Sequence, residues 1–242
     1  MNFDVNDWLG DWISFEHLID SRDPNLERAW KDSTEAMRSK PLFAIMMLGD
    51  ARRFWSKACR TSGRERRDRI GGWHIDRLPA AGDDDGVAGF RLTWLDEGRK
   101  PIATHEYRLD HMHDKGLEGK PCYVFHAIDA VISDPFAVLV AMDPMPERSA
   151  LGHGGLLSHL HFQYASDESK LIKGKGRQAT LRHRMWYPTM CAAEGTLLDQ
   201  CNIVRALHRL QAWKELPIPP SDRPWMGNGR RPHRTPITGN VL

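Results

Sequence analysis

The feature that most limits the fold is a succession of short extended segments, the first two of which, 73–78 and 89–95, alternate apolar and polar residues. Gly, Pro and Asp residues separate these segments. Alternation with a period of two is typical of β-strands with one buried face. The segments are 73–78, 89–95, 102–109, 122–128, 136–142, 156–164 and 179–185. Seven successive strands joined by hairpin-like turns favour a closed antiparallel β-barrel or a sandwich.

Helical patterns flank this strand region on both sides. Asp23 followed by Pro24 predicts the start of a helix that continues to Met37. Apolar residues at helical spacing predict further helices within 42–59 and 196–213. The tryptophan pair in 7–14 fits a short helical turn or a strand that covers apolar surface.

We therefore expect a mainly β protein with flanking helices (α+β). Its predicted parts are an N-terminal helical segment packed on the barrel (1–72), an antiparallel β-barrel that carries the candidate site (73–190), a C-terminal helix (191–216) and a proline-rich flexible tail (217–242).

Composition excludes some classes of partner. The 34 Lys and Arg residues nearly balance the 32 Asp and Glu residues, so no overall field favours nucleic acid or anionic membranes. The N-terminus lacks the pattern of a secretory signal, and the longest apolar run, near 41–48, is too short to span a bilayer. Four cysteines occur without a Cys-x-x-Cys motif. We expect a cytoplasmic protein with reduced cysteines and no nucleic-acid or membrane partner.

The strongest candidate for chemistry is the His-x-His pair of the sixth predicted strand. In an extended strand His159 and His161 share one face, while Leu160 and Phe162 point to the other. Two imidazoles on one face can hold one zinc ion, and an exchangeable zinc site usually has three protein ligands. His153, flanked by glycines, is the candidate third ligand. The alternatives are hydrogen-bonded strand histidines and an exposed loop histidine.

Five further histidine and carboxylate residues are weaker candidates. A second His-x-His, His111 and His113, follows a predicted strand and stands close to Gly116, so we interpret 110–114 as a solvated turn rather than a second site. His126 is expected to face the barrel interior, as a core histidine, a partner of a metal ligand or a general base. Glu106 and Asp129 are candidate carboxylates that orient an imidazole. The sequence contains no Gly-x-Gly-x-x-Gly or Gly-x-Ser-x-Gly motif, so nucleotide-binding and serine-hydrolase interpretations lack support.

Several motifs occur together in the order that one known family has. Asp7-Trp8-Leu9-Gly10-Asp11-Trp12-Ile13-Ser14 is similar to a Trp-x-Gly-x-Trp-x-Ser entry, and Tyr123-Val124-Phe125-His126 to a Tyr-Leu-Phe-Glu strand. Ser158-His159-Leu160-His161-Phe162 is similar to a His-Phe-His-Ile strand, with Asp167-Glu168-Ser169 in the place of Asn-Asp-Ser. Over residues 7 to 212 the chain resembles the ZinT family, also called YodA, of bacterial zinc-binding proteins.

The resemblance implies a calycin β-barrel flanked by helices, with zinc held near the barrel mouth by three histidines. Two of these correspond to His159 and His161. The family's third histidine follows a Ser-Asp pair, where this chain has Ala141-Met142-Asp143-Pro144, so His153 is its nearest counterpart. The chain also lacks an export signal and a His-rich N-terminal segment, two departures from a periplasmic zinc scavenger.

Two functions remain open at this level. The first is a cytoplasmic zinc carrier or buffer, for which an open site rimmed by carboxylates is favourable. The alternative is a zinc-dependent hydrolase or lyase that acts on a small molecule through metal-bound water or Lewis-acid activation. It requires a base, for which His126 and Glu106 are the candidates, and a ligand-facing wall in the barrel, for which Trp73, Trp94 and Tyr123 are the candidates.

Overall fold

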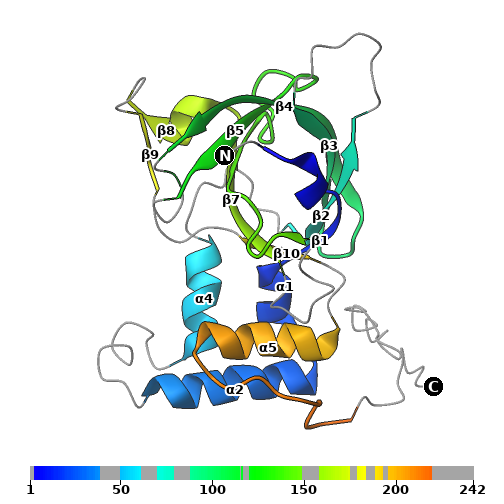
Figure 1. Cartoon of the computed structure of the whole chain (residues 1–242), viewed down its shortest axis with the longest axis vertical. Helices are drawn as coiled ribbons and strands as arrows, with labels where there is room; N and C mark the ends of the chain where they lie inside the picture. Colours follow the sequence, from blue (N-terminus) through cyan, green and yellow to red (C-terminus); the bar gives the residue numbers. More distant parts are fainter. Residues whose placement is uncertain are drawn as a thin grey trace, which may run out of the picture.

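The computed structural model describes residues 3–38, 50–60, 70–78, 88–114, 116, 120–148, 158–174, 179–183, 189–192 and 196–219. Its main element is a closed antiparallel, calycin-like barrel (Figure 1). The barrel strands are β1 (Gly10–Ser14), β2 (Gly72–Arg77), β3 (Gly89–Leu95), β4 (Pro101–His113), β5 (Cys122–Ala127), β6 (Val138–Ala141), β7 (His159–Ala165) and β10 (Thr189–Ala192). Their order around the barrel is β1-β10-β7-β6-β5-β4-β3-β2.

The barrel predicted from sequence is confirmed, but its closure differs from the prediction. The N-terminal segment supplies β1, which pairs with β2 on one side and with β10 on the other. The described residues of the seventh predicted strand, 179–183 of 179–185, do not enter the wall. They include β9 (Thr180–Leu181), which pairs only with β8 (Ile172–Lys173) in a separate two-stranded sheet. For 7–14 the structure confirms the strand, one of the two interpretations that the sequence left open. The sequence left both open because five residues carry too short a pattern to separate a strand from a helical turn.

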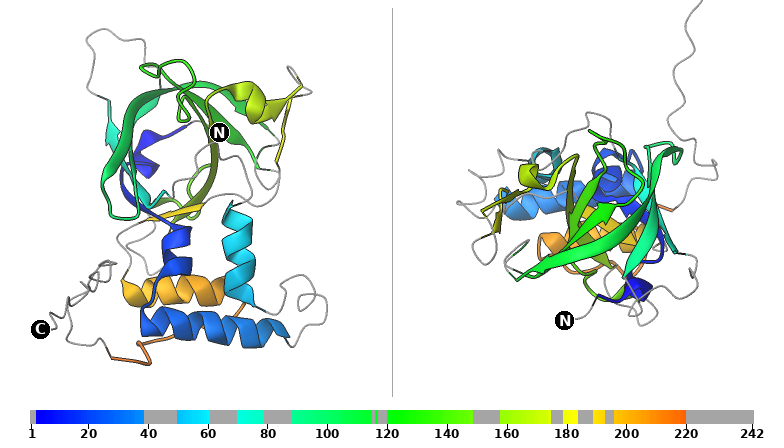
Figure 2. Two further views of the ribbon diagram at one scale, coloured as in Figure 1. Left: turned by 180° about the vertical axis from the view of Figure 1, so that it is seen from behind. Right: turned by 90° about the horizontal axis from the view of Figure 1, so that it is seen from above.

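Helices form a layer against the outer wall of the barrel, beside β1 and β10 (Figures 1 and 2). They are α1 (Phe15–Asp20), α2 (Pro24–Arg38), α4 (Ala51–Arg60) and α5 (Leu197–Leu207). As expected, Asp23 caps α2, since its Oδ1 accepts the backbone N–H of Asn25 at 2.8 Å. The helix expected within 42–59 corresponds to α4, whereas 42–49 lie outside the described residues. The C-terminal helix ends at Leu207, six residues before the predicted end at Trp213.

Aromatic side chains fill the interior of the barrel. The short 3₁₀ helix η1 (Val5–Asp7) lies over one end of the barrel (Figures 1 and 2), and Trp8 directly after it enters the core and stacks on Phe90 with ring centroids 5.7 Å apart. The buried aromatic side chains of this core are Trp8, Trp12, Trp73, Phe90, Trp94, Tyr107, Tyr123, Phe125, Phe136, Phe162 and Tyr164. The N-terminal segment therefore covers apolar surface, as one of the two interpretations of its tryptophans predicts.

The outside of the barrel is covered in two places. The helices pack on Cys191 of β10 through an apolar cluster that includes Phe15, Trp30 and Val204. The sheet of β8 and β9 packs on β5, β6 and β7 through a second cluster, which includes Val124, Val140, Leu171, Ile172 and Leu181. Cys122, Cys191 and Cys201 are buried.

The described C-terminal residues return to α2. The Asn25 side chain accepts the backbone N–H of Ile218 at 2.9 Å and donates to its carbonyl oxygen at 2.8 Å. The rest of the predicted tail, 220–242, lies outside the described residues. Among the described helices, none has both the length and the apolar character needed to cross a bilayer.

The N-terminal cap of α5 stabilises the helix through two reciprocal hydrogen bonds. Thr196 Oγ1 accepts the N–H of Asp199 at 3.2 Å, and Asp199 Oδ2 accepts the N–H of Thr196 at 2.8 Å. Thr196→Ala should lower the free energy of unfolding by roughly 0.5–2 kcal/mol, because the cap is lost. Thr196→Ser keeps the hydroxyl and should stay close to wild type in urea denaturation. Equal stability of the two variants would contradict the capping role.

The pair of His74 and Asp11 predicts a pH dependence of stability. Hydrogen bonds raise the pKa of His74, first the one to Asp11 at 2.9 Å and then the contact with Asp76 at 3.2 Å. Arg99, 3.1 Å from Asp11, is the neighbouring cation. Because the pKa of His74 is higher in the folded protein, protonation of His74 stabilises the fold. This stabilisation is complete below the unfolded pKa of about 6.5, and it is lost as the pH rises through the folded pKa.

His74→Gln should therefore cost more stability near pH 6 than near pH 8. The effect is small because solvent screens these half-exposed side chains. Urea denaturation of both proteins across this range measures the difference. A difference that stays constant with pH would contradict the assignment.

Candidate metal centre

A β-bulge in β4 turns two histidines onto the outer face of the barrel. Leu109 pairs with Phe125 but His111 pairs with Val124, so Asp110 is an extra residue in the wall. After the bulge Met112 packs against the barrel core, and His111 and His113 point outward beside the outer-face residues of β5. Bulges of this kind redirect side chains and are common beside functional sites.

The interpretation of 110–114 as a solvated turn was therefore wrong. Strand β4 continues to His113, because the bulge shifts the alternation by one residue instead of ending the strand.

A short 3₁₀ helix after β7, η4 (Glu168–Lys170), supplies the third side chain of the cluster. Its N-cap Asp167 accepts the backbone N–H of Ser169 at 2.8 Å. Leu171 and Ile172, which follow it, are buried in the outer apolar cluster, so the helix is fixed to the barrel wall. Glu168 consequently reaches the histidines of β4 and β5.

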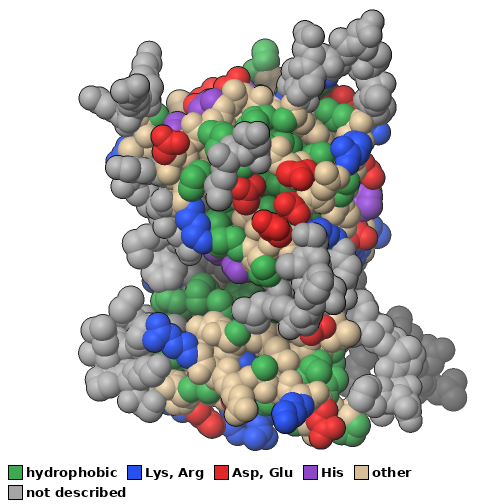
Figure 3. All heavy atoms as spheres, viewed as in Figure 1, with side chains coloured by type: hydrophobic (Ala, Val, Ile, Leu, Met, Phe, Trp, Pro, Cys, Tyr) green, Lys and Arg blue, Asp and Glu red, His purple; other side chains and the backbone are tan. Residues whose placement is uncertain are grey.

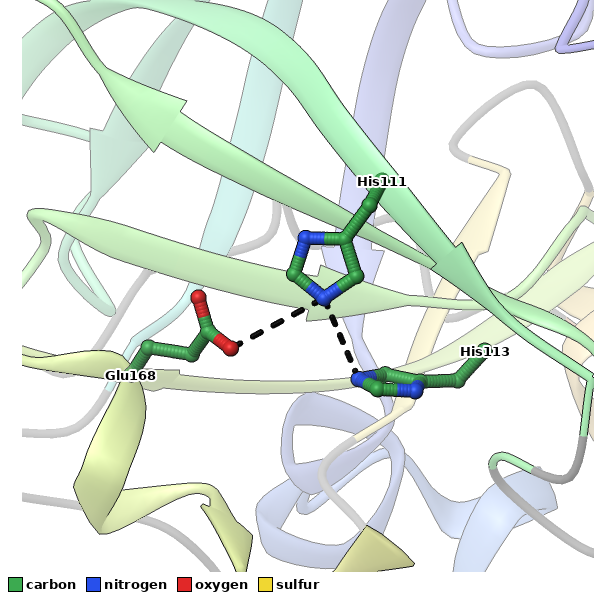
Figure 4. A group of neighbouring side chains, drawn as sticks. All are labelled: His111, His113 and Glu168. Carbon is green, nitrogen blue, oxygen red and sulfur yellow. Dashed lines mark hydrogen bonds and ion pairs between the residues drawn. The ribbon is translucent and has the colours of Figure 1, made fainter. Parts of the chain in front are cut away.

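The side chains of His111, His113 and Glu168 converge (Figure 4). His111 Nε2 lies 3.2 Å from His113 Nε2 and 3.7 Å from Glu168 Oε1, and all three ligand atoms lie within 4.8 Å of one another. Ligands placed 2.0–2.1 Å from a tetrahedral metal ion are about 3.3–3.4 Å apart. The His111–His113 distance is slightly shorter than this spacing, and the His111–Glu168 distance is slightly longer. Small side-chain movements would therefore bring the three atoms to the spacing of metal ligands.

Asp110 orients the imidazole of His111. Its Oδ2 lies 2.6 Å from His111 Nδ1, and this hydrogen bond lowers the pKa of the Asp110 carboxyl. An ionised carboxylate only accepts hydrogen bonds, so His111 donates Nδ1–H and keeps a lone pair on Nε2. A carboxylate behind a histidine in this way is the usual support of a metal-binding imidazole.

The protonation of the cluster also favours a cation. Burial, followed by the neighbouring His111, lowers the pKa of His113, which favours the neutral ring that a metal requires. His111 Nε2 lies 3.2 Å from His113 Nε2, where one ring nitrogen donates to the other, and 3.7 Å from a carboxylate oxygen of Glu168. A metal ion at this point would take the place of the shared proton, since metal binding to imidazoles releases protons.

His126 belongs to the same surface, contrary to the expectation that it faces the barrel interior. Tyr123 and Phe125 occupy the interior, so alternation along β5 places His126 outside. Its Nε2 lies 3.2 Å from Glu168 Oε2, and its side chain is 44% exposed. Asp110, His126 and Glu168 form a second group with ligand atoms within 4.8 Å of one another.

The two remaining candidate carboxylates have other partners. Glu106 accepts from Arg91 Nη2 at 2.6 Å. Asp129 lies 3.2 Å from His105 Nδ1, so it contacts an imidazole as predicted, but that imidazole belongs to neither group with metal-ligand spacing.

The His-x-His pair of β7 also lies on the outer face. His159 and His161 share one face, with ring centroids 5.6 Å apart, while Leu160, Phe162 and Tyr164 fill the interior. His159 is the cross-strand neighbour of Cys191, which packs with the helices, so the pair lies beside the junction of the two layers rather than at the barrel mouth. The surface is hollowed at this junction, where histidine side chains are visible (Figure 3).

His161 is held as a neutral ring. Burial, followed by His159 and Lys120, lowers its pKa to about 3, and its Nδ1 lies 2.7 Å from Thr189 Oγ1. His153, the predicted third ligand, lies outside the described residues. The ligand set of His153, His159 and His161 thus remains a prediction.

The cluster around Glu168 was missed in the sequence because the bulge in β4 was not recognised. The apolar residues Tyr107, Leu109 and Met112 are two and then three positions apart, and this step of three is the signal of the bulge. Recognising it would have extended the strand through His113. Glu168 carries no such signal, since only the folded chain brings it to β4.

Comparison of the chain with models of protein families, with curated proteins and with solved structures finds no match.

The orientation of His111 can be tested without any metal. In the metal-free protein we expect its proton on Nδ1, as reported by the ¹⁵N chemical shifts of the ring. Asp110→Ala should shift the ring toward a mixture of both tautomers, because the acceptor is lost. Asp114→Ala, which removes a carboxylate from the same strand end, should leave the ring unchanged. Unchanged shifts in Asp110→Ala would exclude the orienting role.

Proposed function

We propose that this protein binds a zinc ion through His111, His113 and Glu168 and serves as a zinc carrier or buffer. The observation that carries the proposal is the convergence of three ligand atoms within 4.8 Å, with Asp110 behind His111. Two imidazole nitrogens and one carboxylate oxygen form a donor set typical of zinc, and they leave a fourth position open.

Exposure of the ligands favours exchange of the ion over permanent retention. The side chains of His111 and Glu168 are 35% and 33% exposed, and the more exposed carboxylate of Asp110 borders them. An acceptor ligand from water or from a partner can therefore reach the ion. The resemblance to the ZinT family, whose members hold zinc with histidines in a calycin barrel, supports the same role.

The pair on β7 is a second candidate position for the zinc. His159 and His161 share one face, and the low pKa of His161 keeps that ring neutral. With His153 they would form the three-histidine site that the resemblance implies. The cluster on β4 is preferred because its three donors and its orienting carboxylate all lie within the described residues.

A zinc-dependent hydrolase or lyase is the second candidate function. The open fourth position favours it, since metal-bound water could act there. His126, 3.2 Å from Glu168, would be its candidate base. However, Trp73, Trp94 and Tyr123, expected as the substrate-facing wall, pack in the barrel core with at most 1% exposure. The carrier role is therefore the better supported of the two.

Zinc titration against a chromophoric chelator tests the proposal. His111→Ala and His113→Ala should each weaken zinc binding by more than about tenfold, because even the loss of a residue that only orients a metal ligand typically costs about 10–100-fold. His183→Ala removes an exposed histidine outside both groups and should bind as wild type does.

The double variant His159→Ala with His161→Ala separates the two positions. Wild-type affinity in the double variant supports the β4 site. Wild-type affinity in both single variants, together with loss of binding in the double variant, would overturn the assignment to β4.

A further inference from the structure

The carboxylate of Glu168 faces two different histidines with its two oxygens. Oε1 lies 3.7 Å from His111 Nε2, and Oε2 lies 3.2 Å from His126 Nε2. Each of these histidines belongs to a separate group with metal-ligand spacing, and Glu168 is the member that both groups share. A carboxylate in this position can bridge two ions, which in two-metal sites lie about 3.5–4 Å apart.

We propose that the outer face of β4 and β5 holds two divalent metal ions bridged by Glu168. The first ion binds His111, His113 and Glu168 Oε1. The second ion binds Asp110, His126 and Glu168 Oε2. This inference rests on the proposed zinc function and deepens it, because it assigns the second group of donors and the number of ions.

A single ion leaves donors of the cluster unused. His111 and His113 fall in one group and Asp110 and His126 in the other, since the five donors do not all lie within 4.8 Å of one another. Asp110 can serve both ions, because one oxygen accepts from His111 Nδ1 at 2.6 Å and the other is left for the second ion. His126 Nε2 and Glu168 Oε2, 3.2 Å apart, already have the spacing of neighbouring ligands.

The charges around the cluster suit two divalent ions. Asp110 and Glu168 are the proposed ligands. Two further carboxylates interact electrostatically with the cluster, Asp114 with His113 and Asp167 with His126. Four carboxylates can thus offset the four positive charges of two ions, with Lys170 as a cation that interacts with Asp167. Because two close divalent ions repel, we expect two successive binding steps, the second one weaker.

The first experiment counts the ions. Isothermal titration with zinc, supported by elemental analysis after dialysis against zinc-buffered solution, should give two ions per chain in wild type. His126→Ala should give one ion per chain, with the affinity of the tighter step changed by less than about threefold. His113→Ala should lose the tighter step, whereas His183→Ala should keep both steps.

The outcomes separate the two proposals. One ion per chain in wild type, lost in His113→Ala, would overturn the second ion and leave the zinc function intact. No stoichiometric binding in wild type would overturn both. Two ions that persist in His126→Ala would also overturn the assignment of the second site.

A measurement on the wild-type protein avoids any effect of a substitution on folding. Electron paramagnetic resonance of the protein saturated with Mn²⁺ should show the spectrum of an exchange-coupled pair, because the shared carboxylate links the two ions. Spectra of isolated ions only, at every ratio of metal to protein, would contradict a bridged centre.

Discussion

Packing of aromatic rings inside the barrel determines which way the remaining strand side chains point. Trp94 contacts Phe136 and Tyr164 with ring centroids 4.4 and 5.0 Å apart, and Trp73 contacts Phe162 at 4.4 Å. Each such ring pair adds about 0.5–1.5 kcal/mol beyond the burial of its area. A slip of one residue in any of these strands would expose the rings and bury the polar residues between them, so the register is strongly fixed.

The polar outer face follows from this filled interior. His126 alternates with Phe125, and His159 and His161 alternate with Leu160 and Phe162. Other parts of the chain then cover different sectors of the outer wall. The helices cover β10, while η4 and the two-stranded sheet cover β5 to β7. The candidate metal centre lies between η4 and the outer face of β4 and β5. Its ligands are therefore held by packed elements and yet remain open to solvent.

Much of the fold could be predicted from the sequence, and the site only in part. Alternation and the Gly, Pro and Asp residues between the segments located six of the eight barrel strands, and Asp23-Pro24 located the start of α2, because these signals are local. The sequence left β1 open between a strand and a helical turn and did not indicate β10, and the role of both strands in closing the barrel depends on contacts distant in sequence. A His-x-His motif is a local signal, so the one on β7 was recognised as a candidate. The contact of Glu168 with His111 and His113 on β4 joins residues distant in sequence, so no local pattern indicates it.

Anomalous diffraction at the zinc edge from crystals of the zinc-loaded protein tests the central claim most directly. The account predicts a strong peak about 2.0–2.2 Å from His111 Nε2, His113 Nε2 and a Glu168 oxygen. A zinc peak bonded to His159 and His161, without one beside Glu168, would contradict it.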